Sequence, residues 1–196
     1  MALFFSLWIK LFFVFTPFFA LSMFLTLTEG FEAQRRRKLV ISVSAAVLVI
    51  CLLLFFVGRQ MFALFDITLD AFRIGAGALL LLSSIGLVQG RSGIAGDNTS
   101  GDLAVVPLAI PIIVGPATIG TMLVLGADLV KLSDKLIGCL ALAAAVSCMA
   151  GLLLAGSLIQ RLLGNRGIVI LSRLTGLILA ALAAQLIMTG IRGFLA

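Results

Sequence analysis

Residues 40–57 read VISVSAAVLVICLLLFFV, a run of 18 residues that has no charge and is apolar on every face of a helix. A strand of a membrane barrel alternates polar and apolar side chains, so this run predicts a helix instead. A helix needs roughly 20 mostly apolar residues to cross a hydrocarbon core of about 30 Å. The run is close to that length and therefore predicts a helix that spans a membrane.

The rest of the chain has the same character. Of the 196 residues, 62% are hydrophobic and 11% are charged, whereas about a quarter of the residues of a soluble domain are charged. The charges leave six charge-free stretches, at 11–28, 39–58, 74–90, 103–127, 136–160 and 174–191. Since helices satisfy their own backbone groups in lipid, the sequence predicts an all-α membrane protein with six transmembrane helices in one integral membrane domain.

The basic residues lie beside the ends of these stretches, most densely at Arg35-Arg36-Arg37-Lys38. Loops on the cytoplasmic side carry an excess of Lys and Arg. If this cluster is cytoplasmic, the loops at 29–38, 89–102 and 161–173 are inside and both termini are periplasmic. That orientation places eight basic residues inside and six outside, a modest bias. The sequence thus predicts a multi-pass protein of the bacterial inner membrane, with the lipid bilayer and not a nucleic acid as its surroundings.

The chain shows signs of an internal repeat. Placing residues 72–90 over residues 172–190 superposes Arg73 on Arg173 and Gly90 on Gly190, and at nearly the same offset Thr16-Pro17 corresponds to Gly115-Pro116. Residues 91–102 are polar and small, as in a linker loop. We therefore predict two three-helix repeats, 1–90 and 103–196, each opening with a helix broken by proline. Because each repeat has an odd number of spans, the second is inverted relative to the first.

The fourth charge-free stretch contains several helix breakers. A proline lacks an N–H and clashes with the carbonyl four residues back, which frees the carbonyls near positions 107 and 112. In a membrane such carbonyls are tolerated where they line a watery cavity, and there they bind ions and zwitterions. The candidate substrate-binding residues of this stretch are Pro107, Pro111, Gly115, Pro116 and Thr118. A packing kink without a binding role is the alternative.

The first span offers a second group of candidates. Thr16 and Pro17 form its break, and Ser22 and Thr26 share a helical face four residues apart. These groups are suited to hydrogen bonding with a polar solute. The alternative is that the hydroxyl groups bond back to their own helix, as Ser and Thr often do in membranes.

Two arginines begin the third and sixth spans. Arg73 is followed by Gly77, and Arg173 is followed by Gly176. Either arginine is a gate or substrate anchor, or it is an interfacial residue that extends toward the lipid headgroups. Asp70, three residues before Arg73, is placed to cap the helix or to pair with that arginine. These five positions are predicted to be gating or structural.

Catalytic and metal chemistry have little support in the sequence. The chain has no histidine, its three cysteines lie within predicted spans without CxxC spacing, and no carboxylate falls in a charge-free stretch. We therefore predict no enzyme activity, no metal and no cofactor.

Three stretches resemble the MarC family of bacterial inner-membrane proteins: VVPLAIPIIVGPATIG at 105–120, FRIGAG at 72–77, and residues 170–179 with Arg173 and Gly176. The resemblance covers essentially the whole chain. It implies a member of the broader lysine-exporter type superfamily, some relatives of which are described as neutral amino acid transporters. One position departs from the family pattern: Thr16-Pro17 stands where relatives carry Asn-Pro or Asp-Pro.

Together these features predict a secondary transporter of small neutral or zwitterionic solutes, in particular neutral amino acids. The lack of buried charge argues for such solutes, because a zwitterion is met by opposed helix dipoles without an ion in the membrane. A structural or regulatory membrane protein that binds partners or lipids is the alternative. The sequence leaves open whether H⁺ or Na⁺ is coupled and whether the chain forms a homo-oligomer.

Overall fold

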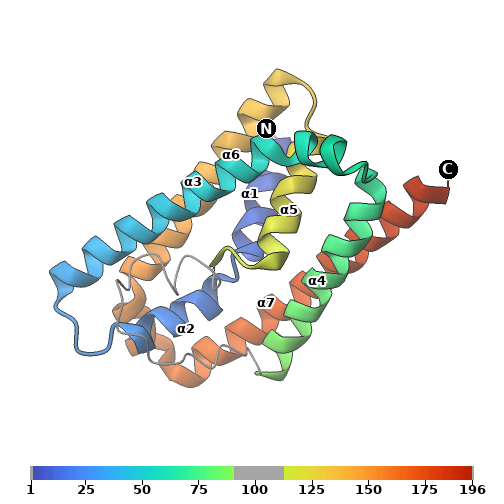
Figure 1. Cartoon of the computed structure of the whole chain (residues 1–196). Helices are drawn as coiled ribbons and strands as arrows, with labels where there is room; N and C mark the ends of the chain where they lie inside the picture. The colour runs from blue at the N-terminus through green and yellow to red at the C-terminus, as the bar shows by residue number, and fades with distance from the viewer. Residues whose placement is uncertain (1, 91–112, 196) are drawn as a thin grey trace.

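A computed structural model describes residues 2–90 and 113–195. These two segments contain seven helices and no strand, which confirms the predicted all-α class (Figure 1). The helices are α1 (Ala2–Val14), α2 (Pro17–Leu27), α3 (Ala33–Phe65), α4 (Leu69–Gln89), α5 (Pro116–Asp128), α6 (Leu132–Leu154) and α7 (Gly156–Leu195). The predicted linker at 91–102 lies outside the described residues, as do Pro107 and Pro111.

Several helices are long and apolar enough to cross a membrane. They are α3, α4, α6 and α7, and the pair α1 and α2, bent by 42° at its break, counts as a fifth candidate span. The fourth predicted span, 103–127, lies partly outside the described residues, and α5 contains most of its described part. The chain is therefore a multi-spanning helical protein, as predicted, with its first span broken at Pro17.

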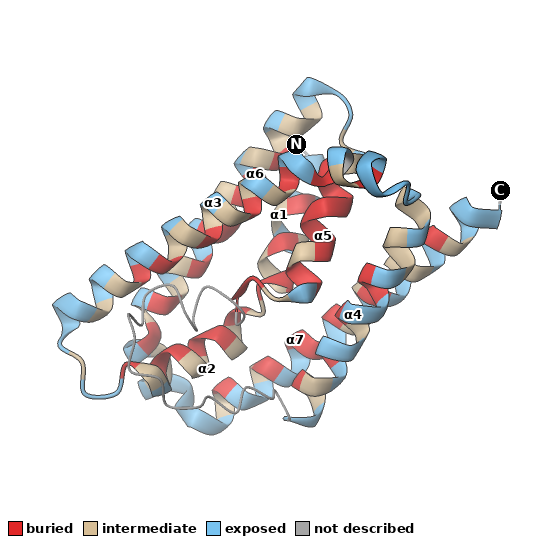
Figure 2. Cartoon of the chain, in the orientation of Figure 1, coloured by how far each residue is buried: buried red, intermediate tan, exposed pale blue. Residues whose placement is uncertain are grey.

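The outer surface is apolar. Leu53, Leu82 and Leu140 are 60%, 66% and 63% exposed, and the outward faces of α3, α4 and α7 carry most of the exposed positions (Figure 2). Exposing such a surface to water costs about 25 cal/mol of free energy for each Å² of apolar area. Lipid removes that cost, so the exposed leucines indicate a membrane around the helices.

Two predicted loops are largely helical. The expected loop at 29–38 contains the start of α3 at Ala33, so the Arg35-Arg36-Arg37-Lys38 cluster lies in the first turns of that helix. The prediction of a loop at 161–173 is wrong, because α7 runs through these residues. The helix is interrupted only at Gly164, where φ is 65° and ψ is 172°. The loops were predicted where charged residues end the apolar stretches of the sequence. A helix that leaves the lipid can nevertheless continue through the interface, because its charged side chains reach the water there.

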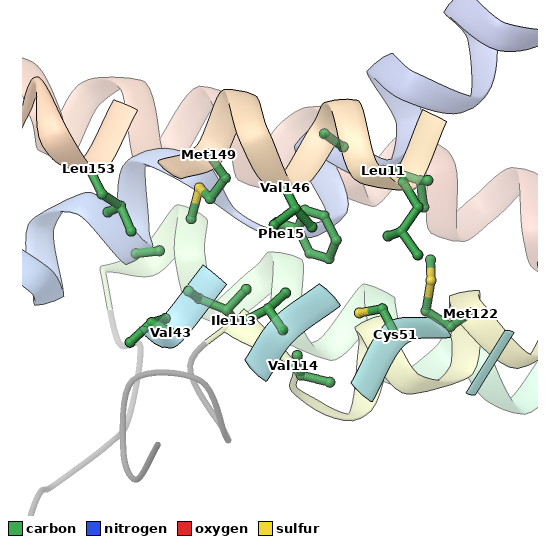
Figure 3. Close-up of a cluster of buried hydrophobic side chains, with 14 of the residues drawn as sticks. Leu11, Phe15, Val43, Cys51, Ile113, Val114, Met122, Val146, Met149 and Leu153 are labelled. Atoms are coloured by element: carbon green, nitrogen blue, oxygen red, sulfur yellow. The ribbon is translucent and has the colours of Figure 1, made fainter. Parts of the chain in front are cut away.

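The half-helix α5 occupies the centre of the packing. Its residues from Gly120 to Gly126 are all buried, and it packs against α3 and α4. One hydrophobic cluster joins α5 to α1, α2, α3 and α6, and Figure 3 shows part of it, with Leu11, Cys51 and Met122 directed toward one another. A smaller cluster joins α5 to α1, α4 and α7.

Glycines set the closest approaches between helices. A Cβ atom on Gly126 would lie 1.8 Å from the carbonyl oxygen of Phe55 in α3, and one on Gly58 would lie 2.5 Å from that of Leu123 in α5. The absence of side chains at these positions lets the two backbones touch, which is a common way to pack helices in lipid.

The pair α4 and α7 is packed in the same way, and it includes two of the predicted gating or structural residues. Cβ atoms on Gly77 and Gly176 would each lie 3.0 Å from a backbone oxygen of the other helix, that of Ala183 and that of Ser84. Both glycines therefore allow close contact between the third and last candidate spans.

Candidate functional site

The first helix break is formed by Thr16 and Pro17. Thr16 has φ 49° and ψ 58°, in the left-handed region, and its side chain makes no capping hydrogen bond to α2. Pro17 is the first residue of α2 and is buried. The proline removes the N–H that would bond the carbonyl of Phe13, and the backbone N–H of Thr16 donates to that carbonyl instead, at 2.9 Å. The carbonyl is thus satisfied within the break itself.

The second break is formed by Gly115 and Pro116. Gly115 is extended, with φ −84° and ψ 179°, and Pro116 is the exposed first residue of α5. Thr118 is buried, and its Oγ1 donates to the carbonyl oxygen of Ile113 across the break at 2.9 Å. The predicted site residue Thr118 therefore satisfies a backbone carbonyl that the broken helix leaves free.

The two breaks belong to helices that contact each other, because α1 packs against α5. Val14, just before the first break, and Ala117, just after the second, belong to one buried cluster. Phe15 and Val114 belong to the other cluster and appear together in Figure 3. Four of the sequence-predicted residues, Thr16, Pro17, Gly115 and Pro116, are thereby brought into one region, whose immediate packing is apolar.

A polar cavity of about 370 Å³ lies between α2, α3 and α7. It includes two of the predicted residues, Ser22 and Thr26, on α2. The remaining walls combine charged, amide and apolar side chains: Leu25, Glu29, Arg36, Gln160, Asn165, Ile168 and Val169. This cavity brings a carboxylate, a guanidinium, two amides and two hydroxyls to one place.

Hydrogen bonds organise the cavity walls. Thr26 Oγ1 donates to the carbonyl oxygen of Ser22 at 3.1 Å, so this hydroxyl bonds back to its own helix. On α7, Gln160 Nε2 donates to Asn165 Oδ1 at 2.9 Å. These two amides flank Gly164, and the interruption of α7 there brings them together.

Arg36 is held in a fixed position at the edge of the cavity. Its Nε and Nη2 donate to the carbonyl oxygen of Thr28 at 3.1 and 2.8 Å. Thr28 is the C-cap residue of α2 and is buried. A guanidinium at this point meets the negative end of the α2 dipole. The first turns of α3 therefore anchor the C-terminus of the half-helix α2.

A network of charges lies at the opposite end of the molecule. Arg73 in α4 pairs with Asp70 at 2.5 Å and with Asp128, the last residue of α5. Lys10 in α1 lies near Asp128 and Arg73. Asp70 pairs with Arg73 as expected, while Thr68 caps α4 by accepting from the N–H of Ala71 at 3.2 Å. The network links three helices, and no three His, Cys, Asp or Glu side chains gather as metal ligands would in the described part of the chain.

The structure does not bring the two repeated arginines together. Arg73 lies at the start of α4, where its Cβ is 3.0 Å from the position of a Cβ on Gly190. Arg173 is exposed, and its Nη2 is 3.5 Å from the position of a Cβ on Gly90, at the end of α4. The arginines therefore mark opposite ends of the α4 and α7 pair.

Sequence reasoning missed the charged and amide residues of the cavity, and it missed Lys10 and Asp128 of the charge network. Glu29 and Arg36 were assigned to a loop and to a topology signal, Gln160 directly precedes the loop predicted at 161–173, and Asn165 falls within it. For Lys10 and Asp128 a signal exists, because each directly flanks a charge-free stretch. Charges at such positions are the ones that reach across to neighbouring helices at a membrane end.

A protein-family model described as MarC family integral membrane protein matches residues 1–195. The chain belongs to the MarC family. Its relatives include a UPF0056 membrane protein of Methanocaldococcus jannaschii, 35% identical over 95% of this chain and 94% of its own. A UPF0056 membrane protein of Pyrococcus abyssi is 32% identical over 95% and 93%, and the UPF0056 inner membrane protein YhgN of Escherichia coli is 32% identical over 90% and 89%. No solved structure matches the chain.

Membership of the MarC family confirms the resemblance seen in the sequence. It also establishes that the chain is an integral membrane protein, in agreement with its exposed leucines and long apolar helices. The names of the relatives state a membrane location and no substrate.

Proposed function

We propose that this MarC family protein is a secondary transporter of small neutral or zwitterionic solutes, in particular neutral amino acids. The observation that carries the proposal is the polar cavity between α2, α3 and α7. Polar and charged groups that line a cavity beside membrane-spanning helices mark the pathways of solutes. A volume of about 370 Å³ is in the range of small-molecule sites.

The helix breaks extend this site toward the centre of the molecule. The half-helix α2 lines the cavity near its C-terminus and starts at the first break. The N-terminus of a half-helix carries partial positive charge, which favours a carboxylate on its way through the bilayer. Ser172 adds a polar group one helical turn beyond Ile168 on α7, since its Oγ is buried without a partner in the described residues.

The helix contacts support the inverted repeat. If residues 1–90 and 103–196 are two inverted three-helix repeats joined by 91–102, α2 corresponds to α5 and α4 to α7. A two-fold axis then requires that α2 packs against α7 wherever α5 packs against α4, and both contacts occur. Rocking of one repeat against the other is the usual mechanism of such carriers.

The charges support one orientation in a bacterial inner membrane. Lys10 in α1 lies near Arg73, and a Cβ on Gly193 in α7 would lie 2.6 Å from the Asp70 carboxylate, so both termini lie at the end of the Arg73 network. The other end carries Arg35-Arg36-Arg37-Lys38 and is the cytoplasmic one by the positive-inside rule. Both termini are then periplasmic. Coupling to H⁺ or Na⁺ and assembly into a homo-oligomer complete the proposal, which involves no enzyme activity and no cofactor.

One observation favours the alternative of a non-transporting protein that binds lipids or partners. An apolar groove of about 470 Å³ lies between α4 and α5 and is lined by Phe72, Gly75, Ala76, Leu79, Pro116, Ile119 and Gly120. Its lining suits an acyl chain better than a polar solute.

Uptake into liposomes separates the two functions. The purified protein is reconstituted, and uptake of labelled alanine, glycine and serine is measured under proton and sodium gradients. We expect uptake by the unmodified protein and its loss in the double variant Gly115→Leu, Pro116→Ala. The control is Gly151→Ala, whose added Cβ meets no atom within 4 Å. Absence of uptake of all three solutes under both gradients would overturn the proposal in favour of the lipid- or partner-binding protein.

A further inference from the structure

The polar cavity contains two opposite charges that do not neutralise each other. Glu29 and Arg36 both line it. Within residues 2–90 and 113–195, however, the ion pairs are those of Arg73 with Asp70 and Asp128, so Glu29 and Arg36 do not pair with each other. The carboxylate and the guanidinium are therefore more than 4.0 Å apart, and both line the same space.

From this arrangement we propose that Glu29 and Arg36 form the recognition site for a free α-amino acid, with Arg36 binding the carboxylate and Glu29 binding the ammonium group. This inference rests on the proposed function and names the groups that select its substrate. A zwitterion compensates both charges of the cavity, whereas a singly charged solute leaves one of them unpaired. Each charge-assisted hydrogen bond adds to the affinity for the zwitterion, so the site discriminates by charge pattern.

Arg36 is prepared for this role before the ligand arrives. Its Nε and Nη2 are bound to the carbonyl oxygen of Thr28, and Nη1 has no partner among the described residues. The guanidinium is planar, so fixing two of its nitrogens also fixes the direction of the third. A donor that is already oriented loses little entropy when it binds a carboxylate.

Glu29 and the remaining walls define the other half of the site. Glu29 directly follows Thr28, and its carboxylate makes no hydrogen bond to the described residues. The amide pair of Gln160 and Asn165 supplies further polar groups. Leu25, Ile168 and Val169 provide an apolar wall for a short side chain. The site is therefore suited to amino acids with small apolar or hydroxyl side chains.

Binding of three related probes to the purified full chain tests the inference. Labelled L-alanine carries both charges, L-lactate lacks the ammonium group, and L-alaninamide lacks the carboxylate. We expect the unmodified protein to bind alanine at least about 10-fold more tightly than either analogue, a difference of about 1.4 kcal/mol. Glu29→Gln is expected to weaken alanine binding about 10-fold or more and to shift preference toward lactate. Arg36→Gln is expected to shift preference toward alaninamide.

The change of preference is the decisive measurement, because a general loss of structure weakens all three probes alike. Glu32→Gln and Arg37→Gln are matched controls, since both residues are exposed neighbours that do not line this cavity. If Arg36→Gln fails to fold because it releases Thr28, Glu29→Gln decides the question alone.

The outcomes distinguish this inference from the proposed function. Equal alanine binding and uptake by Glu29→Gln and the unmodified protein would overturn the recognition site and leave the transporter intact. If the unmodified protein neither binds nor transports any of the tested amino acids, both are overturned. A lipid headgroup can also be zwitterionic, so glycerophosphoethanolamine is tested as a competitor of alanine. If it displaces alanine at lower concentrations than alanine itself does, the cavity belongs to a lipid and the inference is wrong.

Discussion

Replacing Gly126 by alanine tests how closely α5 packs against α3. The added Cβ would lie 1.8 Å from the carbonyl oxygen of Phe55 and 2.7 Å from its carbonyl carbon. Both atoms belong to the backbone, so no rotation of a side chain relieves the overlap. Ordinary contact begins near 3.4 Å, which requires the two helices to separate by roughly 1.6 Å in an interior that is packed like a crystal.

The expected loss of stability follows from these contacts. Overpacking of a rigid interior typically costs about 1–3 kcal/mol. The upper part of this range applies, because separating the helices also loosens the contact of Gly58 with Leu123 and forfeits dispersion energy along the interface. The higher helix propensity of alanine offsets about 1 kcal/mol at most. We therefore expect Gly126→Ala to lower the free energy of unfolding by about 2 kcal/mol.

Unfolding of the purified protein in increasing mole fractions of SDS, followed by far-UV circular dichroism, measures this loss. Gly151→Ala in α6 is the matched variant, because its Cβ has open space, and we expect it to be as stable as the unmodified protein or slightly more stable. If Gly126→Ala unfolds at the same SDS fraction as Gly151→Ala, the backbones of α3 and α5 are not in contact, and the reasoning from glycine packing fails.

Three further substitutions probe other parts of the structure. Arg73→Gln leaves two half-buried carboxylates without their partner and is expected to destabilise the protein by about 1 kcal/mol, with a smaller loss at high salt. SDS unfolding at two salt concentrations measures this loss, and the control Arg192→Gln is expected to have little effect. Thr118→Val removes the buried hydrogen bond to a backbone carbonyl and is expected to lower the free energy of unfolding by about 1–2 kcal/mol. The exposed Thr189→Val is expected to be nearly neutral, and equal SDS unfolding curves for the two variants would show that the Thr118 bond is absent. Gly164→Ala places a Cβ on a backbone conformation that only glycine adopts easily, so we expect the free energy of unfolding to fall by about 1–3 kcal/mol although the surrounding space is open. An unchanged midpoint of thermal unfolding would show that α7 is not interrupted at this residue.

Much of the fold is predictable from the sequence because lipid imposes simple requirements. The uninterrupted apolar runs at 40–57 and 136–154 lie within α3 and α6, since length and composition suffice to specify a spanning helix. The break before Pro17 follows from the missing N–H of proline, and the break before Pro116 follows from the same property. These features are local, so a single sequence reveals them.

The features that were missed depend on contacts between distant segments. The pairing of Arg73 with Asp128 joins residues of α4 and α5, and the sequence places both beside charge-free stretches without indicating that they meet. The same holds for the cavity, because Glu29 and Asn165 meet only after α2 and α7 have packed. The interruption at Gly164 was missed for another reason: a glycine in a polar stretch looks the same in a loop and in a broken helix.

The burial of α5 divides the chain into two regions that tolerate change differently. Around the outside, at positions such as Leu82 and Leu140, lipid accepts apolar side chains of any shape, so Ile, Val, Phe and Met are interchangeable there. From Gly120 to Gly126 the surroundings are other helices, and size rather than hydrophobicity decides which residue fits. Over evolutionary time the outer faces are therefore free to drift while α5 keeps its small residues. A library of single substitutions should divide along the same line, and bulky reporter groups belong on the outer leucines.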